Sequence, residues 1–391
     1  MKKSTIAIQS PFPHRDAYGA IAMPVYHTDA YEFDNAAVMS DAFCGRINEP
    51  DYSRITNPTV IHFENRVKAL TGARDVVALN SGMAAISNVI LTLSGTGKNI
   101  VTSRHLFGNT FALLSKTMKR FGVECRAIDL LDENAVTEAV DDDTCALFFE
   151  IITNPQLEVA DVGMLARVAH SHNVPLVADT TAIPFTEFDG HALGIDIEVV
   201  SSTKYISGGA TTLGGLIIDY GTVADFDERL RRDTLMNFGA YMTPHVAYMQ
   251  TLGLENLNAR YALQWRNTEA LAEKLRTLPR IVSVNYVGFA DNPFHELMKR
   301  QYGGTAGAML TIDLADEQAC FNFLNNLKVV KRATNLFDNK TLAIHPASTI
   351  FGPFTASQRR EMDVKETTIR LSVGLEDVDD IFEDIASALG N

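Results

Sequence analysis

The chain has 391 residues, of which 46% are hydrophobic and 21% charged, so we expect an ordinary globular protein of roughly two to three domains rather than a disordered or fibrous one. Its formal net charge of −14 argues against nucleic acid as a partner, because the neutralisation of phosphates needs clustered Lys and Arg. Four widely spaced cysteines, no apolar run as long as a membrane span and no apolar stretch behind the two N-terminal lysines favour a cytoplasmic protein without a metal site, a disulfide framework or a membrane partner.

The first 56 residues contain several prolines and many polar residues, and they show no regular period. We therefore predict that residues 1–56 form an arm that packs on something else rather than an independent domain. The first regular element is expected to be a helix. Asn57 can cap it, Pro58 suits its first position, and apolar residues recur at helical spacing from Val60 until Gly72.

Strands and helices then alternate up to about residue 245. Strands are expected at residues 75–79, 99–103, 145–152, 174–179, 197–202 and 214–219, and helices at 83–93, after residue 132 and at 161–173. Because the strands are almost continuously apolar and helices separate them, we predict an α/β fold whose mostly parallel central sheet is covered by helices on both faces. Residues 57–245 would form this large domain.

The pattern changes in the last third of the chain. A long helical region at 247–278 precedes shorter strands at 306–314, 341–346 and 368–373, and an amphipathic helix ends the sequence. This predicts a smaller α+β domain over residues 246–391.

Polar residues follow three of the predicted strands, at the sheet edge where open α/β sheets bind ligands. Ser81 and Gly82 precede a helix that starts at Met83, and free backbone N–H groups at a helix start form an anion site that a glycine lets a phosphate approach. Asp179 ends another strand, where it can cap the next segment or hold a positive ring nitrogen. Taken alone, the turn at Ser81 and Gly82 is equally well explained as an ordinary connection between a strand and a helix.

Lys204 follows the strand at 197–202, and Ser201 and Thr203 beside it can donate to a phosphate. A lysine at a strand end is more often a snorkelling surface residue. Taken with the anion site and Asp179, however, it completes what pyridoxal 5′-phosphate (PLP) needs: a lysine for attachment, an acid for the ring nitrogen and a phosphate site. The nucleotide motifs G-x-x-x-x-G-K-[ST] and G-x-G-x-x-G are absent, so we predict a PLP enzyme with Lys204 as its catalytic residue.

Five motifs run in order from residue 51 to residue 377: DYSRITNPT, NSGMAA, SSTKYISGG, IHPAST and TIRLSVGLED. They resemble the signatures of the Cys/Met metabolism family of PLP enzymes, which includes cystathionine synthases and lyases, methionine lyases and O-acetylhomoserine sulfhydrylases. The resemblance implies PLP fold type I. It also implies a homo-oligomer, a dimer of dimers, in which the arm of one subunit contributes to the active site of its neighbour.

The resemblance implies a role for each site residue. Lys204 would attach the cofactor and later move protons, Asp179 would pair with the pyridinium nitrogen, and Arg370 would bind the substrate α-carboxylate. The implied cofactor-binding set is Tyr52, Arg54, Ser81, Gly82, Met83, Phe107, Asn154, Asp179, Thr181, Ser201, Thr203 and Lys204. Tyr52 and Arg54 would reach the phosphate of the neighbouring subunit. The implied substrate-binding set is Asn154, Thr341 and Arg370.

Two further runs, NLFDNKTLAIHPAST and GGATTLGG, are similar to those of O-acetylhomoserine sulfhydrylases, and Asn109 stands where methionine lyases usually carry a cysteine. The resemblance therefore favours γ-replacement on O-acetyl-L-homoserine by a sulfur donor, sulfide or a thiol, to give homocysteine or methionine and acetate. Phe107 departs from the family, which commonly has a tyrosine over the cofactor ring, so the usual help from a phenolic proton is in doubt.

Other functions stay open at this point. Within the family the alternatives are a γ-lyase of the methionine or cystathionine type and a cystathionine γ-synthase. A PLP-binding regulator would need a DNA-reading segment, and the sequence has no spare basic domain for one. A protein with a dead site would be expected to lose Lys204, Asp179 or Arg370, and all three are present.

Overall fold

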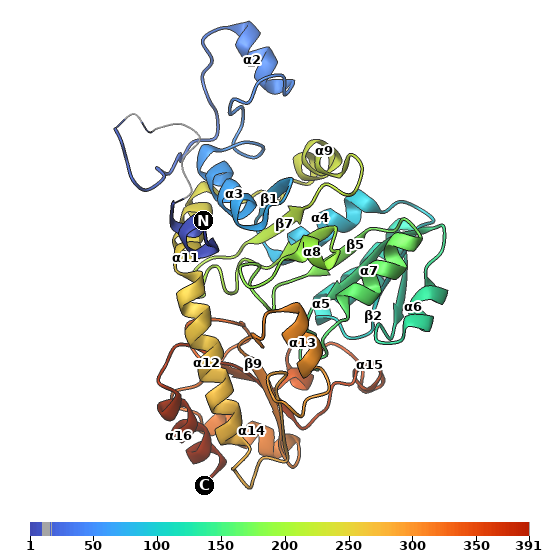
Figure 1. Ribbon diagram of the computed structural model, residues 1–391, viewed down its shortest axis with the longest axis vertical. Coiled ribbons are helices and arrows are strands. Elements are labelled where there is room, and N and C mark those ends of the chain that lie inside the picture. Colours follow the sequence, from blue (N-terminus) through green and yellow to red (C-terminus); the bar gives the residue numbers. More distant parts are fainter. Residues whose placement is uncertain (10–15, 17, 391) are drawn as a thin grey trace.

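The computed structural model describes residues 1–9, 16 and 18–390. A seven-stranded sheet lies in the upper part of the molecule in Figure 1, and its strand order is β1-β7-β6-β5-β4-β2-β3. Its strands are β1 (Asp75–Leu79), β2 (Asn99–Ser103), β3 (Glu124–Ile128), β4 (Thr144–Glu150), β5 (Leu176–Asp179), β6 (Ile197–Val200) and β7 (Gly215–Asp219). Only the pairings of β7 with β6 and with β1 are antiparallel, so the prediction of a mostly parallel sheet is confirmed.

The strand β3 is missing from the sequence-based prediction. It lies at the edge of the sheet and pairs only with β2, and none of its five residues is fully buried. An edge strand with charged residues such as Glu124 and Arg126 lacks the continuous apolar run that reveals the central strands.

Helices cover both faces of this sheet, as the apolar strands indicate. Along β4, Leu147 and Phe149 lie in one hydrophobic core and Phe148 lies in the other, because successive side chains of a strand point to opposite faces. The helical segments of this part are α3 (Pro58–Thr71), α4 (Gly82–Leu93), α5 (Gly108–Ala112), η1 (Leu113–Thr117), η2 (Met118–Phe121), α6 (Glu133–Ala139), α7 (Val162–Ser171), α8 (Gly190–Leu193), α9 (Phe226–Arg229), η3 (Leu230–Leu235) and α10 (Met236–Phe238).

The helix α3 begins and ends as its sequence predicts. The Asn57 side chain accepts a hydrogen bond from the backbone N–H of Thr59 (3.0 Å), and Pro58 occupies the first turn. Gly72 ends the helix with φ +71°, a left-handed conformation that glycine adopts without strain.

A five-stranded sheet lies in the lower part of Figure 1, with the order β10-β11-β12-β9-β8. Its strands are β8 (Ser283–Asn285), β9 (Met309–Asp313), β10 (Lys331–Arg332), β11 (Leu342–Ile344) and β12 (Thr368–Ser372). The helical segments here are α12 (Leu257–Leu275), α13 (His295–Gln301), α14 (Glu317–Asn326), η4 (Pro346–Ser348), α15 (Ala356–Glu361) and α16 (Val378–Leu389). The helix α11 (Pro244–Glu255) precedes them and packs against α3 in the upper part of Figure 1. The boundaries of arm and domains at 56 and 245 stay predictions, but each sheet lies within one of the two predicted domains.

The N-terminal arm is more regular than its sequence suggests. It contains α1 (Lys3–Gln9) and α2 (Ala36–Phe43), while residues 10–15 and 17 of the predicted arm lie outside the described residues. Lys3 Nζ donates to the backbone oxygens of Phe185 (3.0 Å) and Phe188 (2.7 Å), which holds α1 on the body of the protein. By contrast, α2 projects away from both sheets in Figure 1.

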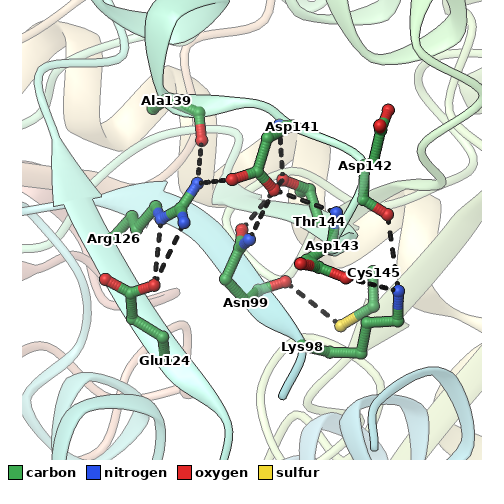
Figure 2. A network of polar contacts seen from close by, with 10 residues as sticks. All are labelled: Lys98, Asn99, Glu124, Arg126, Ala139, Asp141, Asp142, Asp143, Thr144 and Cys145. Atoms are coloured by element: carbon green, nitrogen blue, oxygen red, sulfur yellow. Dashed lines mark hydrogen bonds and ion pairs between the residues drawn. The ribbon is translucent and has the colours of Figure 1, made fainter.

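A polar network joins the amino ends of three neighbouring strands, away from the edge where ligands are expected (Figure 2). Asp141 accepts hydrogen bonds from Arg126 (2.6 Å) and Asn99 (2.8 Å), and these bonds hold the pKa of its carboxyl group below the ordinary value. Arg126 also pairs with Glu124 at 3.1 Å. The network ties the turn before β4 to β2 and β3.

Candidate active site

The carboxyl ends of β4, β5 and β6 open into a cavity of about 870 Å³, which residues following β10 and on β12 also line. Parallel strands bring their carboxyl ends to one edge, so residues far apart in the sequence meet there. The cavity is lined by most of the predicted site residues: Ser81, Gly82, Met83, Phe107, Asn154, Asp179, Thr181, Ser201, Thr203, Lys204 and Arg370.

The predicted anion site lies at the start of α4. The Ser81 hydroxyl accepts from the backbone N–H of Ala84 (3.1 Å) and so caps the helix, while the N–H groups of Gly82 and Met83 precede any acceptor that the helix itself can offer. A Cβ on Gly82 would lie 2.7 Å from Cβ of Ser201, which means that only glycine lets the two segments approach this closely. A phosphate fits here, against backbone N–H groups and a hydroxyl side chain.

The loop after β6 completes this cradle in a way that the sequence does not reveal. The Thr181 hydroxyl accepts the backbone N–H of Ser201 (2.8 Å), so it positions the loop. The Thr203 hydroxyl donates to the backbone oxygen of Gly214 (3.1 Å) and accepts from the N–H of the same residue (2.9 Å). Thr203 thus fastens the two ends of the loop that carries Lys204.

A buried carboxyl group, Glu150, and a half-buried one, Asp179, lie side by side at the ends of β4 and β5. Glu150 and Asp179 are partners in the strand register, and burial raises the pKa of both. The charge of Asp179 raises the pKa of Glu150 further, whereas Thr181 and Lys204 oppose the shift of Asp179. Two adjacent carboxyl groups do not both ionise readily, and the pKa of Glu150 is raised by burial and by the charge of Asp179, so Asp179 is the better placed of the two to meet a cation.

Glu150 has no role in the sequence-based prediction, yet it lines the cavity. Its Oε1 accepts the backbone N–H of Phe107 (2.6 Å), which fixes the aromatic wall of the cavity. The signal was present in the sequence: a glutamate interrupts an apolar strand at its carboxyl end, as Asp179 does.

Lys204 is a half-buried amine that points to Asn335, a second residue that the sequence-based prediction does not assign. Lys204 Nζ donates to Asn335 Oδ1 (2.8 Å), and Asn335 Nδ2 donates to Asp338 Oδ2 (3.1 Å). Burial lowers the pKa of Lys204 to about 8, the charge of Arg370 lowers it as well, and Asp179 and Asp338 act in the opposite direction. An amine with this pKa gives up and takes back a proton near neutral pH.

Arg370 on β12 is a buried cation, and the structure gives it no carboxylate partner among the described residues. Its Nη1 donates to Asn154 Oδ1 (3.2 Å), and its Nη2 donates to the backbone oxygens of Thr334 (3.1 Å) and Asn335 (3.2 Å). Burial lowers its pKa to about 9, and its Nε is buried without a hydrogen-bond partner. Such a group fits an anionic part of a ligand.

Three predicted site residues do not line the cavity. The Thr341 hydroxyl donates to Glu376 Oε2 (2.8 Å) and accepts the backbone N–H of Gly374 (2.9 Å), so packing within the second sheet occupies it. Arg54 Nη1 donates to the backbone oxygen of Met236 (2.5 Å), and the same guanidinium lies 5.5 Å from the ring centre of Tyr52. Tyr52 and Arg54 are therefore outside the cavity of their own chain, and their role in the site of a neighbouring subunit stays a prediction.

The donor set fits PLP. A helix start offers backbone N–H groups to a phosphate, Asp179 offers a carboxylate to a ring nitrogen, and Lys204 offers a primary amine in the same cavity. Among the described ranges, no group of three or more His, Cys, Asp or Glu residues could hold a metal ion, and no helix is both long and apolar enough to span a membrane.

Comparisons with known proteins agree with this site. A sequence model of the family described as "Cys/Met metabolism PLP-dependent enzyme" matches residues 4–390. The L-methionine gamma-lyase of Pseudomonas putida is 34% identical over 99% of this chain and 96% of its own length, and the O-succinylhomoserine sulfhydrylase of Pseudomonas aeruginosa is 34% identical over 98% and 94%. The O-acetyl-L-homoserine sulfhydrylase of Corynebacterium glutamicum is 32% identical over 93% and 91%.

A solved structure shares the whole fold. A putative O-acetylhomoserine (thiol)-lyase from Campylobacter jejuni, which carries a pyridoxyl-lysine phosphate, matches all of this chain and all of its own with a TM-score of 0.96 and 29% identity. The strands and helices described above are thus arranged as in a chain whose lysine is joined to the cofactor.

Proposed function

The chain belongs to the Cys/Met metabolism family of PLP-dependent enzymes, whose members catalyse γ-elimination and γ-replacement, and from this premise we propose that it replaces the acyl group of an O-acylhomoserine, O-acetyl-L-homoserine first, by a sulfur nucleophile. The products would be homocysteine, or methionine from a methyl thiol, and acetate. The observation that carries this proposal is Phe107 in the wall of the cavity, together with the absence of any tyrosine among the described lining residues.

A leaving group departs as readily as its conjugate acid is strong. Carboxylic acids have a pKa of about 4 and thiols of about 8.5, so a carboxylate leaves without the proton that a thiolate needs. Phe107 packs against a ring but has no proton to give. A cavity with this wall therefore suits an acyl ester better than a thioether such as methionine.

Each lining group has a part in such a reaction. Backbone N–H groups of Gly82 and Met83 and the hydroxyl of Ser201 would hold the PLP phosphate, and Asp179 would hold the ring nitrogen. PLP supplies an electron sink that acidifies the hydrogens on the substrate carbons next to the amine. Lys204 would both attach the cofactor and carry protons between these carbons, because its pKa of about 8 suits both directions of transfer.

The substrate would be held by its carboxylate. Arg370 has spare N–H donors and lies in a buried position where an anion interacts strongly with it. Asn335 holds the amine of Lys204 and, through its backbone oxygen, the guanidinium of Arg370, so the proton carrier and the carboxylate site are fixed relative to each other.

The second candidate is a γ-lyase that makes a 2-oxo acid, ammonia and a thiol. It is favoured by relatives named L-methionine gamma-lyase, whose identity to this chain, 32 to 35%, is as high as that of the sulfhydrylases. Against it stand Phe107, Asn109 and the sulfhydrylase-like run NLFDNKTLAIHPAST. A homo-oligomer in which Tyr52 and Arg54 complete the site of the neighbouring subunit is part of the proposal for either reaction.

The test is to incubate the PLP-loaded enzyme with O-acetyl-L-homoserine, with and without sulfide, and to quantify acetate, homocysteine and 2-oxobutanoate. Homocysteine that forms only with sulfide, with little 2-oxobutanoate, supports the replacement reaction. Abundant 2-oxobutanoate without sulfide, or faster turnover of L-methionine, supports the lyase instead. The matched control is Lys204→Ala, which removes the proton carrier and should abolish all three products.

A further inference from the structure

A buried histidine beside the aromatic wall of the cavity contacts two carboxylates. His105 follows β2 and is 3% exposed. Its Nδ1 lies 2.6 Å from Glu158 Oε2 and its Nε2 lies 2.8 Å from Asp363 Oδ2. Arg104 Nε is directed at the same Nε2 as a hydrogen-bond donor, at the longer distance of 3.3 Å, and Arg104 Nη2 lies 3.6 Å from the carboxylates of Asp363 and Asp129.

These contacts specify the protonation of the ring. An ionised carboxylate only accepts hydrogen bonds, and a neutral imidazole has a single N–H, so one of the two short contacts would lack a proton if His105 were neutral. Burial and the Arg104 charge lower the pKa of His105, but the hydrogen bonds to Glu158 and Asp363 and the charge of Glu158 outweigh them and raise it. The contact of Nε2 with Asp363 (2.8 Å) is shorter than its contact with Arg104 (3.3 Å), so we assign a proton to Nε2 and both ring nitrogens donate. Arg104 then has no acceptor on the ring and is held near it by its own carboxylate partners.

The two carboxylates come from different parts of the molecule. Glu158 follows β4 of the large sheet, whereas Asp363 follows α15, in the long connection between β11 and β12 of the small sheet (Figure 1). Asp363 adopts φ +53°, a left-handed conformation that aspartate and asparagine tolerate better than most residues. His105 thus links a segment that follows a strand of the large sheet to a connection of the small sheet, at one side of the cavity.

Between His105 and the cavity, residues 107–111, which follow the histidine, are in contact with residues 350–354, which precede Asp363; we call this contact the seam. The rings of Phe111 and Phe354 meet edge to face at 6.2 Å. A Cβ on Gly108 would lie 2.9 Å from the backbone oxygen of Ile350, so the two backbones approach closely. Phe107 and Ile350 then face the cavity from the two sides of this seam.

We propose that His105 is a positioning residue that fastens residues 346–363 to the Phe107 wall and so holds the substrate cavity closed along this seam while both of its ring nitrogens carry protons. His105 is not among the residues that line the cavity, and its hydrogen-bond partners are not among them either. This proposed role concerns the cavity wall alone and applies to both the replacement and the lyase reaction. An experiment that refutes the role of His105 therefore leaves the proposed function untouched, and the reverse also holds.

The expected pH dependence follows from the direction of the shift. The pKa of His105 is raised in the folded state. The two hydrogen bonds that His105 donates are therefore fully present below the ordinary histidine pKa of 6.5, and they are lost as pH rises through the raised pKa. The charged groups that face the ring are Glu158, Asp363 and Arg104, the last of which is neutralised in part by Asp129. The segment 346–363 should therefore loosen in mild alkali.

The test is hydrogen exchange of the PLP-loaded enzyme, followed by mass spectrometry on peptides from residues 346–363 and corrected for the intrinsic rate of exchange. From about pH 6 to about pH 9 the corrected exchange of the natural enzyme should rise about tenfold, the factor expected when a charge-assisted hydrogen bond is lost. His105→Gln should exchange at about pH 6 as the natural enzyme does at about pH 9, with no further rise. The dissociation constant of L-norleucine, a methionine isostere with no leaving group, should increase about three- to tenfold in this variant.

Three further variants separate fastening from general packing. Asp363→Asn keeps the left-handed backbone and lies at the surface, so it should fold and reproduce the effect even if His105→Gln does not. Gln156→Ala removes a neutral hydrogen bond across the same seam, from Gln156 Nε2 to the backbone oxygen of Met362 (2.5 Å), and should loosen it equally at every pH. Glu361→Gln, an exposed carboxylate on α15 without contact to His105, should change nothing. Exchange of 346–363 that is independent of pH in the natural enzyme, or unchanged in Asp363→Asn, would overturn the proposal.

Discussion

Replacement of Arg370 by lysine tests whether this buried cation binds the substrate carboxylate. The guanidinium makes three hydrogen bonds, to Asn154 and to the backbone oxygens of Thr334 and Asn335, and so uses three of its five N–H donors. Lysine keeps the charge, but its three donors sit on one compact nitrogen and do not reproduce the planar arrangement. At least one hydrogen bond between substrate carboxylate and enzyme should therefore be lost in Arg370→Lys.

The size of the effect follows from the kind of bond. A hydrogen bond that involves a charged group contributes about 1.5–3 kcal/mol, so kcat/KM for O-acetyl-L-homoserine should fall about 10- to 150-fold. Because the carboxylate stays bound during the reaction, most of the loss should appear as a higher KM rather than a lower kcat. Steady-state kinetics with acetate release as the readout measures both.

Two controls make the result interpretable. PLP content and the thermal unfolding midpoint should show that Arg370→Lys is folded and loaded. The dissociation constant of L-norleucine, which shares the carboxylate of the substrate and cannot react, should rise by the same factor as KM. A kcat/KM within threefold of the natural enzyme would refute the assignment of Arg370 to the carboxylate.

Three further predictions concern other parts of the chain. Phe107→Tyr adds a phenolic proton to the cavity wall, so it should raise the release of methanethiol from L-methionine about 10- to 100-fold and leave acetate release nearly unchanged, as a comparison of the two rates would measure. Asn335→Ala removes the hydrogen bond from Lys204 Nζ (2.8 Å) and should lower kcat about tenfold at unchanged PLP content. Asp141→Asn weakens the network of Figure 2 and should lower the thermal unfolding midpoint by ~1–3 °C at neutral pH. The pKa of Asp141 is lowered on folding, so its contribution to stability is present above the ordinary value of 3.8 and is lost as pH falls through the folded value. The difference in midpoint between the variant and the natural enzyme should therefore vanish in strong acid.

Each of these predictions has a result that contradicts it. A large gain in acetate release in Phe107→Tyr would mean that the acyl group also needs an acid, and the argument from the leaving group would fail. An unchanged kcat in Asn335→Ala would show that the Lys204 amine is oriented by other groups. A midpoint difference for Asp141→Asn that persists in strong acid would point to lost packing instead of charge.

The sequence revealed those site residues that interrupt an apolar strand or follow it directly. Gly82, Asp179 and Lys204 stand out because a glycine, a carboxylate and an amine are unusual neighbours of buried strands, and parallel strands bring their carboxyl ends together. Glu150 offered the same signal, but the reading of its strand as one continuous apolar run concealed it. The general location of the site was therefore predictable from the positions of polar residues at the ends of apolar strands in the sequence.

Contacts between the two sheets were not predictable in this way. Asn335 reaches Lys204 across 131 positions of sequence, and no periodicity encodes that distance. Thr341 was assigned to the substrate from resemblance alone, yet the register of β11 against β12 directs its hydroxyl to Gly374 and Glu376. Which face a side chain takes at a strand end depends on pairing that only the folded sheet specifies.

Within the large sheet the strand β1 pairs only with β7, whose residues follow it by about 140 positions, and it reaches the rest of that sheet through this one neighbour. During synthesis at about 5–20 residues per second, β1 therefore waits roughly 7 to 30 seconds for its partner to leave the ribosome. The helix α3 already covers one face of β1, but the pairing edge of β1 and the side chains of α4 that pack on β7 stay uncovered over that interval. Folding of the anion site at the start of α4 is thus a late event, and a chain that stalls before residue 215 presents an unpaired apolar strand to chaperones and to other nascent chains.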